Sequence, residues 1–334
     1  MEINITAGML LVIMAGTFSG TFAIPLKFNT RWQWENNWII WTVFALLVMP
    51  WIVSLITVPD LFSIYAESID NVLLVALFGT IWGIGAILFG RGIHYLGVSL
   101  SLPIMLGLIN SVGTIMPIVY KDPAALLEPS GLQILSGVGI LLVGIVIVSI
   151  AGRKKDAGQN ESSDASGKSF TLGIIVCILA GLFGPMVNFA FVFGEPMQLK
   201  AIETGTASTF ASNTIWSIAL TCGFIANFVY CLYLLRKNNT AKLFKNSTPA
   251  YWFWAALSGI IWYCSVMFYG MGSNKLGDLG ASVGWALMQS LAIIAGNVSG
   301  ILAGEWKGAG KRSVIIMAAG MLVLLLGVLV IAFV

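Results

Sequence analysis

The chain has 334 residues, of which 58% are hydrophobic and only 9% are charged, and its formal net charge is +3. An average soluble domain carries about 25% charged residues, which cover the surface that water contacts. The composition therefore excludes a cytosolic enzyme, a nucleic-acid-binding protein and a disordered chain, and it indicates a membrane protein that crosses the bilayer several times.

Apolar runs long enough to cross a bilayer recur along the whole chain. A transmembrane helix needs about 20 apolar residues, whereas a barrel strand is about half as long and alternates in polarity. The first run follows Glu2 and no basic residue, so we expect a membrane span there and not a cleaved signal peptide. The sequence predicts ten spans, at 5–26, 37–58, 72–90, 98–119, 131–151, 170–193, 210–235, 250–270, 279–303 and 313–334.

The loops between these spans differ in charge. Counted in chain order, the odd-numbered loops hold 14 of the 17 lysines and arginines, and the even-numbered loops hold only Lys121, Lys200 and Lys275. The positive-inside rule then places the odd-numbered loops in the cytoplasm. With ten spans, we expect both termini outside, and we expect the protein in the plasma membrane, which is the inner membrane of a bacterium.

The longest connection, 152–169, is rich in Ser, Gly, Asp and Lys, a composition typical of a flexible linker. It separates a first five-span segment, 1–151, from a second, 170–334. The two segments resemble each other in sequence. Residues 79–97 align with 259–277 without gaps, and shorter matches follow in the same order between the first spans and between the last spans of each segment.

Because each segment has five spans, an odd number, the second segment must enter the membrane in the opposite orientation. The sequence therefore predicts an all-α membrane protein with ten transmembrane helices in two inverted five-helix repeats. This arrangement is typical of secondary transporters, whose substrate site lies near the midplane between the repeats. A duplicated scaffold without a transport role is the alternative.

Four stretches of the sequence resemble one known family. They are Trp32, Trp34, Glu35 and Trp38 after Pro25 and Lys27; Trp82, Gly83, Ile84, Gly85, Gly90, Tyr95, Leu96 and Gly97; Trp262, Tyr263, Phe268 and Tyr269; and Glu305, Trp306, Ala309, Gly310 and Arg312. Together they are similar to the L-rhamnose–proton symporter family, within the drug/metabolite transporter superfamily, over essentially the whole chain. The resemblance implies a ten-helix bundle that takes up a sugar with protons. Ser265, Ala281 and Gln289 stand where the family pattern leads us to expect glutamine, aspartate and histidine.

Neutral polar residues in the middle of spans are candidates for the substrate site. Asn110 lies in the fourth predicted span, and Asn188 follows Gly184 and Pro185 in the sixth. An amide in hydrocarbon needs a partner, which is either another helix or a polar ligand, and both readings are open for Asn110 and Asn188. We expect Gly184 and Pro185 to interrupt their helix, either as a simple kink or to expose backbone groups to a substrate.

Aromatic residues within spans are the other candidates, because one face of a sugar ring is apolar and packs on aromatic rings. Five such residues lie within predicted spans, namely Trp82, Trp262, Tyr263, Tyr269 and Trp285, and we expect all of them except Tyr269 to contact the substrate. Gln289 follows Trp285 by four residues, so the two share one helix face. This pair is the strongest single prediction of substrate contact.

Proton coupling needs a group that titrates within the transport path, and the spans contain few ionisable residues. Glu35, His94 and Glu195 are the nearest candidates, although each can also be read as an ordinary interfacial or loop residue. Uniport and sodium coupling therefore stay open.

No motif indicates an enzyme, a cofactor or a bound metal. A P-loop is absent, and the single histidine cannot complete a zinc site. We expect the cysteines to be apolar packing residues. They are Cys177, Cys222, Cys231 and Cys264. The tryptophans at 32, 34 and 38 are predicted to anchor the protein at the membrane interface.

The sequence thus predicts a secondary carrier that imports a small neutral sugar, foremost L-rhamnose, by proton symport through alternating access. We expect its partners to be the sugar, a coupling ion (H⁺ or Na⁺) and the lipid bilayer, without nucleic acid. Two alternatives are a metabolite or drug exporter of the same superfamily and a membrane protein that does not transport.

Overall fold

The computed structural model describes residues 3–157, 167–245, 247–304 and 306–334, so the middle of the predicted linker and Glu305 lie outside the described residues. Within this part of the chain, ten helical stretches are long and apolar enough to cross a membrane, and each overlaps one predicted span. They are Ile5–Phe28, Trp34–Thr57, Ile69–Gly97, Leu100–Lys121, Pro129–Lys155, Phe170–Glu203, Ser208–Lys237, Pro249–Lys275, Gly280–Leu302 and Lys311–Ala332. The predicted number and order of spans are confirmed.

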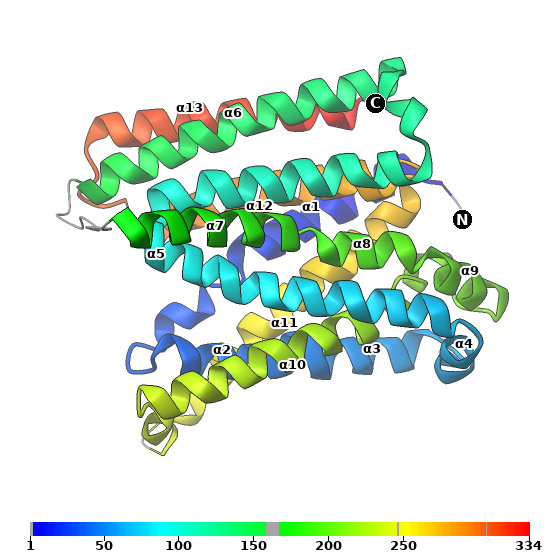
Figure 1. Ribbon diagram of the computed structural model, residues 1–334, viewed down its shortest axis with the longest axis horizontal. Coiled ribbons are helices and arrows are strands. Elements are labelled where there is room, and N and C mark those ends of the chain that lie inside the picture. The colour runs from blue at the N-terminus through cyan, green and yellow to red at the C-terminus, as the bar shows by residue number, and fades with distance from the viewer. Residues whose placement is uncertain (1–2, 158–166, 246, 305) are drawn as a thin grey trace.

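Figure 1 shows these helices running roughly along the long axis of the molecule. The α-helices are α1 (Ile5–Thr21), α2 (Trp34–Thr42), α3 (Met49–Thr57), α4 (Leu61–Glu67), α5 (Ile69–Lys121), α6 (Pro129–Ala157), α7 (Gly167–Phe183), α8 (Met186–Phe193), α9 (Glu195–Glu203), α10 (Asn213–Lys237), α11 (Pro249–Lys275), α12 (Gly280–Leu302) and α13 (Lys311–Ala332). The odd-numbered loops lie at the left in Figure 1, which we name the basic end. Both termini, α4 and α9 lie at the right, which we name the terminal end.

Many of the helix–helix contacts join one half of the chain to the other. The first helix, α1, packs against α11 and α12, and α7 packs against α5. Glycines permit these close approaches, because a Cβ on Gly8 would lie 2.9 Å from Leu276 Cδ2 and a Cβ on Gly173 would lie 2.5 Å from Leu96 Cδ2. In the same way, α6 packs against α13, and α10 packs against α2, α3 and α5.

Glycine also ends two of the long spans. Gly97 has φ +70° and divides α5 into two membrane spans, and Gly277 has φ +77° between α11 and α12. These two glycines are aligned in the sequence comparison of the halves. A residue with a Cβ is strained at such a φ, so glycine lets the chain reverse here within few residues.

Two spans are interrupted near the middle of the bundle. Helix α7 ends at Phe183 and α8 begins at Met186, so the predicted break at Gly184 and Pro185 is confirmed. The second span contains a π-helical segment, Val43–Val48, between α2 and α3. Single π turns inside helices occur often at functional sites.

The predicted interfacial tryptophans do not share one environment. Trp34 is 46% exposed, as an anchoring residue would be, whereas Trp32 is 6% exposed. The Trp32 ring contacts the rings of Phe244, Tyr251 and Trp252, so for this residue the anchoring prediction is wrong. The reason is tertiary, because the first odd-numbered loop folds against the start of α11 and leaves Trp32 inside protein.

Candidate functional site

A cavity of about 260 Å³ lies in the middle of the bundle, and we name it the central cavity. Small-molecule pockets commonly measure about 300–1,000 Å³, so this volume suits a small solute. Both halves of the chain contribute to its walls. The lining residues are Ser19, Phe22, Trp38, Trp41, Trp82, Gly85, Ala86, Phe89, Ile109, Ala180, Gly184, Val187, Trp216, Trp262, Ser265, Val266, Tyr269, Trp285, Met288 and Gln289.

Tryptophan dominates the walls of the central cavity. Trp82 on α5 and Trp262 on α11 stack with ring centroids 5.4 Å apart, and Trp41 on α2 meets Trp262 edge-on at 5.1 Å. The indole of Trp285 on α12 donates a hydrogen bond of 3.0 Å to the carbonyl of Ile109 on α5, which holds this ring in the wall. The cavity therefore presents flat, rigid apolar surfaces of the kind that pack on one face of a sugar ring.

Polar groups in the lining are few, and several have no protein partner. The half-buried Gln289 makes no hydrogen bond to the residues that the structure describes, and the indole N–H groups of Trp41 and Trp216 are buried without a partner there. Ser265 has only a long contact of 4.0 Å, to Met288 Sδ. Unpaired buried donors and acceptors are costly unless water or a ligand binds them. Among these groups, the amide of the half-buried Gln289 is available to a hydroxyl of a solute, whereas the two indole N–H groups are covered by protein atoms.

Four of the seven predicted substrate residues line this cavity, namely Trp82, Trp262, Trp285 and Gln289. The four-residue spacing of Trp285 and Gln289 does place both on the cavity side of α12. Tyr263 is fully buried outside the lining, and its hydroxyl has no partner among the described residues.

The two asparagines lie outside the lining and join helices. The amide nitrogen of Asn110 donates to Ser290 Oγ at 3.2 Å. Its amide oxygen accepts a hydrogen bond of 3.4 Å from the hydroxyl of Thr114, one turn further along the same helix. Asn188 donates to the carbonyls of Gly113 at 2.8 Å and Ala281 at 3.2 Å. Of the two readings open from the sequence, these bonds favour the role of helix-to-helix contact.

Several lining residues were not predicted to contact the substrate, above all Trp41, Trp216 and Tyr269, although Tyr269 was noted in the sequence as an aromatic residue within a span. The duplication contains a signal for one of them. Tyr269 is aligned with Phe89, and both line the cavity, as do the aligned tryptophans Trp82 and Trp262. Trp41 and Trp216 lie outside the segments aligned above, but both occur in the second span of their five-span segment, each after an isoleucine (Ile40 and Ile215). Trp38, predicted to be an interfacial anchor, also lines the cavity and stacks on Trp41 at 4.2 Å.

The three predicted coupling residues lie outside the central cavity. Glu35 is 5% exposed at the basic end and accepts hydrogen bonds from Asn238 Nδ2 at 2.9 Å and Thr240 Oγ1 at 2.7 Å. His94 is exposed, and Glu195 pairs with Lys121 Nζ at 2.8 Å at the terminal end. No Asp, Glu or His is among the described residues of the lining, and no group of three or more His, Cys, Asp or Glu in the described chain could hold a metal ion.

The central cavity is closed toward the terminal end. There its wall consists of Tyr269, Trp216 and Trp285, which are 1%, 0% and 3% exposed. Toward the basic end the lining includes Trp38 and Phe89, which are partly exposed. The cavity thus extends from the middle of the bundle toward the basic loops.

Ten apolar helices around a cavity that both halves of the chain line are an arrangement suited to a membrane transporter for a small solute. Residues 1–333 match the family described as L-rhamnose-proton symport protein (RhaT). The chain is 32% identical over 333 residues to the L-rhamnose-proton symporters of Yersinia pestis (strain Pestoides F) and Yersinia pseudotuberculosis serotype O:1b (strain IP 31758), with 96% of each chain covered. The chain belongs to the L-rhamnose-proton symport family.

Proposed function

We propose that this protein imports a small neutral sugar, foremost L-rhamnose, by proton symport through alternating access. The observation that carries the proposal is the central cavity, in which stacked tryptophans adjoin the unpaired amide of Gln289. Family membership supports the same reaction, which is the one named for the relatives.

The chemistry of the cavity fits this sugar class. L-rhamnose is a 6-deoxyhexose, so it has a methyl group where most hexoses have a hydroxymethyl group, and it needs fewer polar partners. In the proposed complex, Trp82, Trp262 and Trp285 pack on the ring, and Gln289 and Ser265 bind hydroxyls. Ser265 and Gln289 are two of the positions that differ from the expected family pattern, so they are also the first residues to test for sugar specificity.

The proposal includes two inverted five-helix repeats, 1–151 and 170–334. Two aligned residue pairs, Trp82 with Trp262 and Phe89 with Tyr269, line the same cavity. The aligned glycines Gly8 and Gly173 both pack against an aligned leucine of the other half. Because the two repeats have equivalent contacts, they can exchange conformations and give a second state that is open to the other side of the membrane. Alternating access requires such a pair of states.

We place the basic end in the cytoplasm, by the excess of lysine and arginine in its loops. Both termini then lie outside. In this orientation the central cavity is open to the cytoplasm and closed to the outside, which is the state that releases an imported sugar.

Proton coupling needs a titrating group, and Glu35, His94 and Glu195 are the candidates. Glu195 differs from the other two because it and Lys121 line a second cavity at the terminal end, on the proposed entry path. Glu35 lies at the basic end and already accepts hydrogen bonds from Asn238 and Thr240. We therefore expect Glu195→Gln to weaken the effect of a proton gradient more than Glu35→Gln or His94→Gln.

The test is uptake of labelled L-rhamnose into proteoliposomes, with and without an inward proton gradient. Uptake stimulated by the gradient supports the whole proposal. Uptake that does not depend on the proton gradient supports L-rhamnose as the substrate and contradicts proton coupling, and a sodium gradient is then tested. No uptake by folded protein contradicts the proposal for this sugar, and other neutral sugars follow.

One observation favours a second function, export of a metabolite or drug. The central cavity has few polar side chains, which also suits an amphipathic cargo. Flux in everted and right-side-out vesicles separates the two, because an importer accumulates its solute only in the right-side-out form under the natural gradient. A membrane protein that does not transport would show neither flux nor stabilisation by any small solute.

A further inference from the structure

A second cavity, of about 140 Å³, lies at the terminal end of the bundle, and we name it the outer chamber. Its lining includes the ion pair of Lys121 and Glu195, and the amides of Gln198 and Asn274, which bond to each other at 2.8 Å. The outer chamber and the central cavity share no lining residue in the part of the chain that the structure describes, and an aromatic layer lies between them.

The layer between the two cavities is made of three rings. Phe191 lines the outer chamber, and Trp216 and Tyr269 line the central cavity. The Phe191 ring stacks on Trp216 with centroids 5.8 Å apart and lies 5.5 Å from the ring of Tyr269. All three side chains are buried, at 6%, 0% and 1% exposed. A solute cannot pass from one cavity to the other unless these rings move.

A hydrogen-bonded cluster holds one of the rings in place. The hydroxyl of Tyr269 on α11 donates to Asn188 Oδ1 on α8. The amide nitrogen of Asn188 in turn donates to Gly113 O on α5 and Ala281 O on α12. The hydroxyl of Tyr269 also lies 3.2 Å from the carbonyl of Ala281, so one side chain of α11 joins a cluster that includes α5, α8 and α12. Because the cluster is buried, loss of the hydroxyl leaves an acceptor of Asn188 without a partner.

We propose that Phe191, Trp216 and Tyr269 form the outer gate of the transport path, and that the Tyr269–Asn188 hydrogen bond keeps this gate closed while the central cavity is open at the basic end. The inference rests on the proposed function, and it assigns one step of alternating access to named residues. Entry of solute from the outer chamber requires that the bond break and that the ring of Tyr269 turn away from Phe191.

Cysteine labelling tests the gate without any sugar. The four native cysteines are first replaced by alanine or serine. Ser265→Cys then reports on the central cavity, and Asp278→Cys, at an exposed residue of the outer chamber, reports on the terminal end. A membrane-impermeant maleimide is applied to sealed vesicles of both orientations. We expect Asp278→Cys to react from the terminal end only, and Ser265→Cys from the basic end only.

Adding Tyr269→Phe is expected to raise the reaction rate of Ser265→Cys from the terminal end by about tenfold, the equivalent of one lost hydrogen bond. Tyr263→Phe is the matched control, because Tyr263 lies on the same helix, is equally buried and has no described partner for its hydroxyl. Tyr263→Phe should leave the reaction rate of Ser265→Cys unchanged. Phe191→Ala, which removes a ring and no hydrogen bond, should raise the same rate and replaces Tyr269→Phe if that variant does not fold.

An unchanged rate in both Tyr269→Phe and Phe191→Ala overturns the gate. So does a Ser265→Cys parent that reacts from the terminal end as fast as Asp278→Cys. Uptake of L-rhamnose is measured on the cysteine-free parent in parallel. If labelling is as expected but L-rhamnose is not taken up, the proposed substrate is contradicted and the proposed gate is supported. If L-rhamnose is taken up but labelling is not as expected, the substrate is supported and the gate is contradicted.

Discussion

The central cavity and the outer chamber lie on one proposed path, but they differ in whether their amide side chains have a protein partner. In the outer chamber, charged and amide side chains bind each other, as Lys121 does with Glu195 and Asn274 with Gln198. In the central cavity, the amide of Gln289 and the indole of Trp41 have no partner among the described residues. The difference leaves the Gln289 amide free to bind a ligand, whereas the amides of Asn274 and Gln198 must first leave each other.

The largest effect is expected from Gly113→Ala, which would displace the Trp285 ring that lines the central cavity. A Cβ at this position would lie 2.1 Å from Nε1 of Trp285, so the indole must leave its bond to Ile109. Overpacking of this kind costs about 1–3 kcal/mol, and we expect transport to be lost with a lower thermal midpoint.

Uptake assays and thermal unfolding in detergent measure the two effects of Gly113→Ala. Gly139→Ala is the control, because a Cβ there meets nothing within 4 Å, and it should leave both quantities unchanged. Normal uptake by Gly113→Ala would show that the position of the Trp285 ring does not matter to the solute.

A smaller effect is expected from Gln289→Leu, which removes the unpaired amide and keeps the volume. Loss of one hydrogen bond to the solute should raise the KM for sugar roughly tenfold, with unchanged abundance in the membrane. Asn297→Leu on the same helix is the matched control, since its amide bonds only to the carbonyl of Ile293 at 2.8 Å. Equal KM values for the two variants would remove Gln289 from the site.

Asn274→Ala tests the opposite property of the outer chamber. Because Asn274 and Gln198 satisfy each other, its loss should lower stability by about 1–3 kcal/mol and leave the KM for sugar within about twofold. Denaturation curves and uptake kinetics on the same preparation separate the two quantities. A large rise in KM without a loss of stability would instead make the outer chamber a sugar site.

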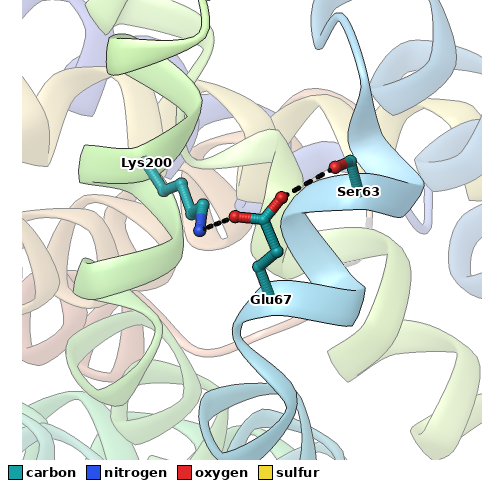
Figure 2. A network of polar contacts seen from close by, with 3 residues as sticks. All are labelled: Ser63, Glu67 and Lys200. Carbon is teal, nitrogen blue, oxygen red and sulfur yellow. Dashed lines mark hydrogen bonds and ion pairs between the residues drawn. The ribbon is translucent and has the colours of Figure 1, made fainter.

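The smallest effect is expected at the surface of the terminal end, where Lys200 pairs with Glu67 and Ser63 donates to the same carboxylate (Figure 2). Lys200, and then Ser63, hold the pKa of Glu67 below its ordinary value of 4.5. A lowered pKa in the folded state means that the pair stabilises the protein at neutral pH, and that this contribution is lost as the pH falls through the folded-state pKa.

Glu67→Gln should therefore lower the thermal midpoint only slightly, since exposed ion pairs contribute little. The midpoints of the variant and the parent should stay apart from pH 7 down to about 4.5, the ordinary pKa, and converge below it. Convergence near pH 6 would mean that another group, and not Glu67, titrates there.

Much of this architecture follows from the apolar pattern alone. A bilayer satisfies no backbone hydrogen bonds, so a long apolar run must be a helix, and the ten spans could be counted before the structure was known. The break at Gly184 and Pro185 was predictable because proline lacks an N–H. The shared face of Trp285 and Gln289 follows from the helical period.

Residues of the candidate site could be predicted from the sequence only where their positions on a single helix place them together. Trp38 lies near the start of its span, where the sequence favours an interfacial anchor, yet it lines the central cavity together with Trp41. Asn110 and Asn188 look like substrate ligands in sequence, yet their amides bind residues of other helices.

The sequence by itself determined the number of spans, the break in the sixth and the one-helix pairing of Trp285 with Gln289, because each depends on local hydrophobicity and helix geometry. Only the tertiary structure decided which tryptophans line the cavity and which amides are already bound. Those outcomes depend on partners such as Asn188 and Ala281, which lie far apart along the chain and meet only when the helices pack.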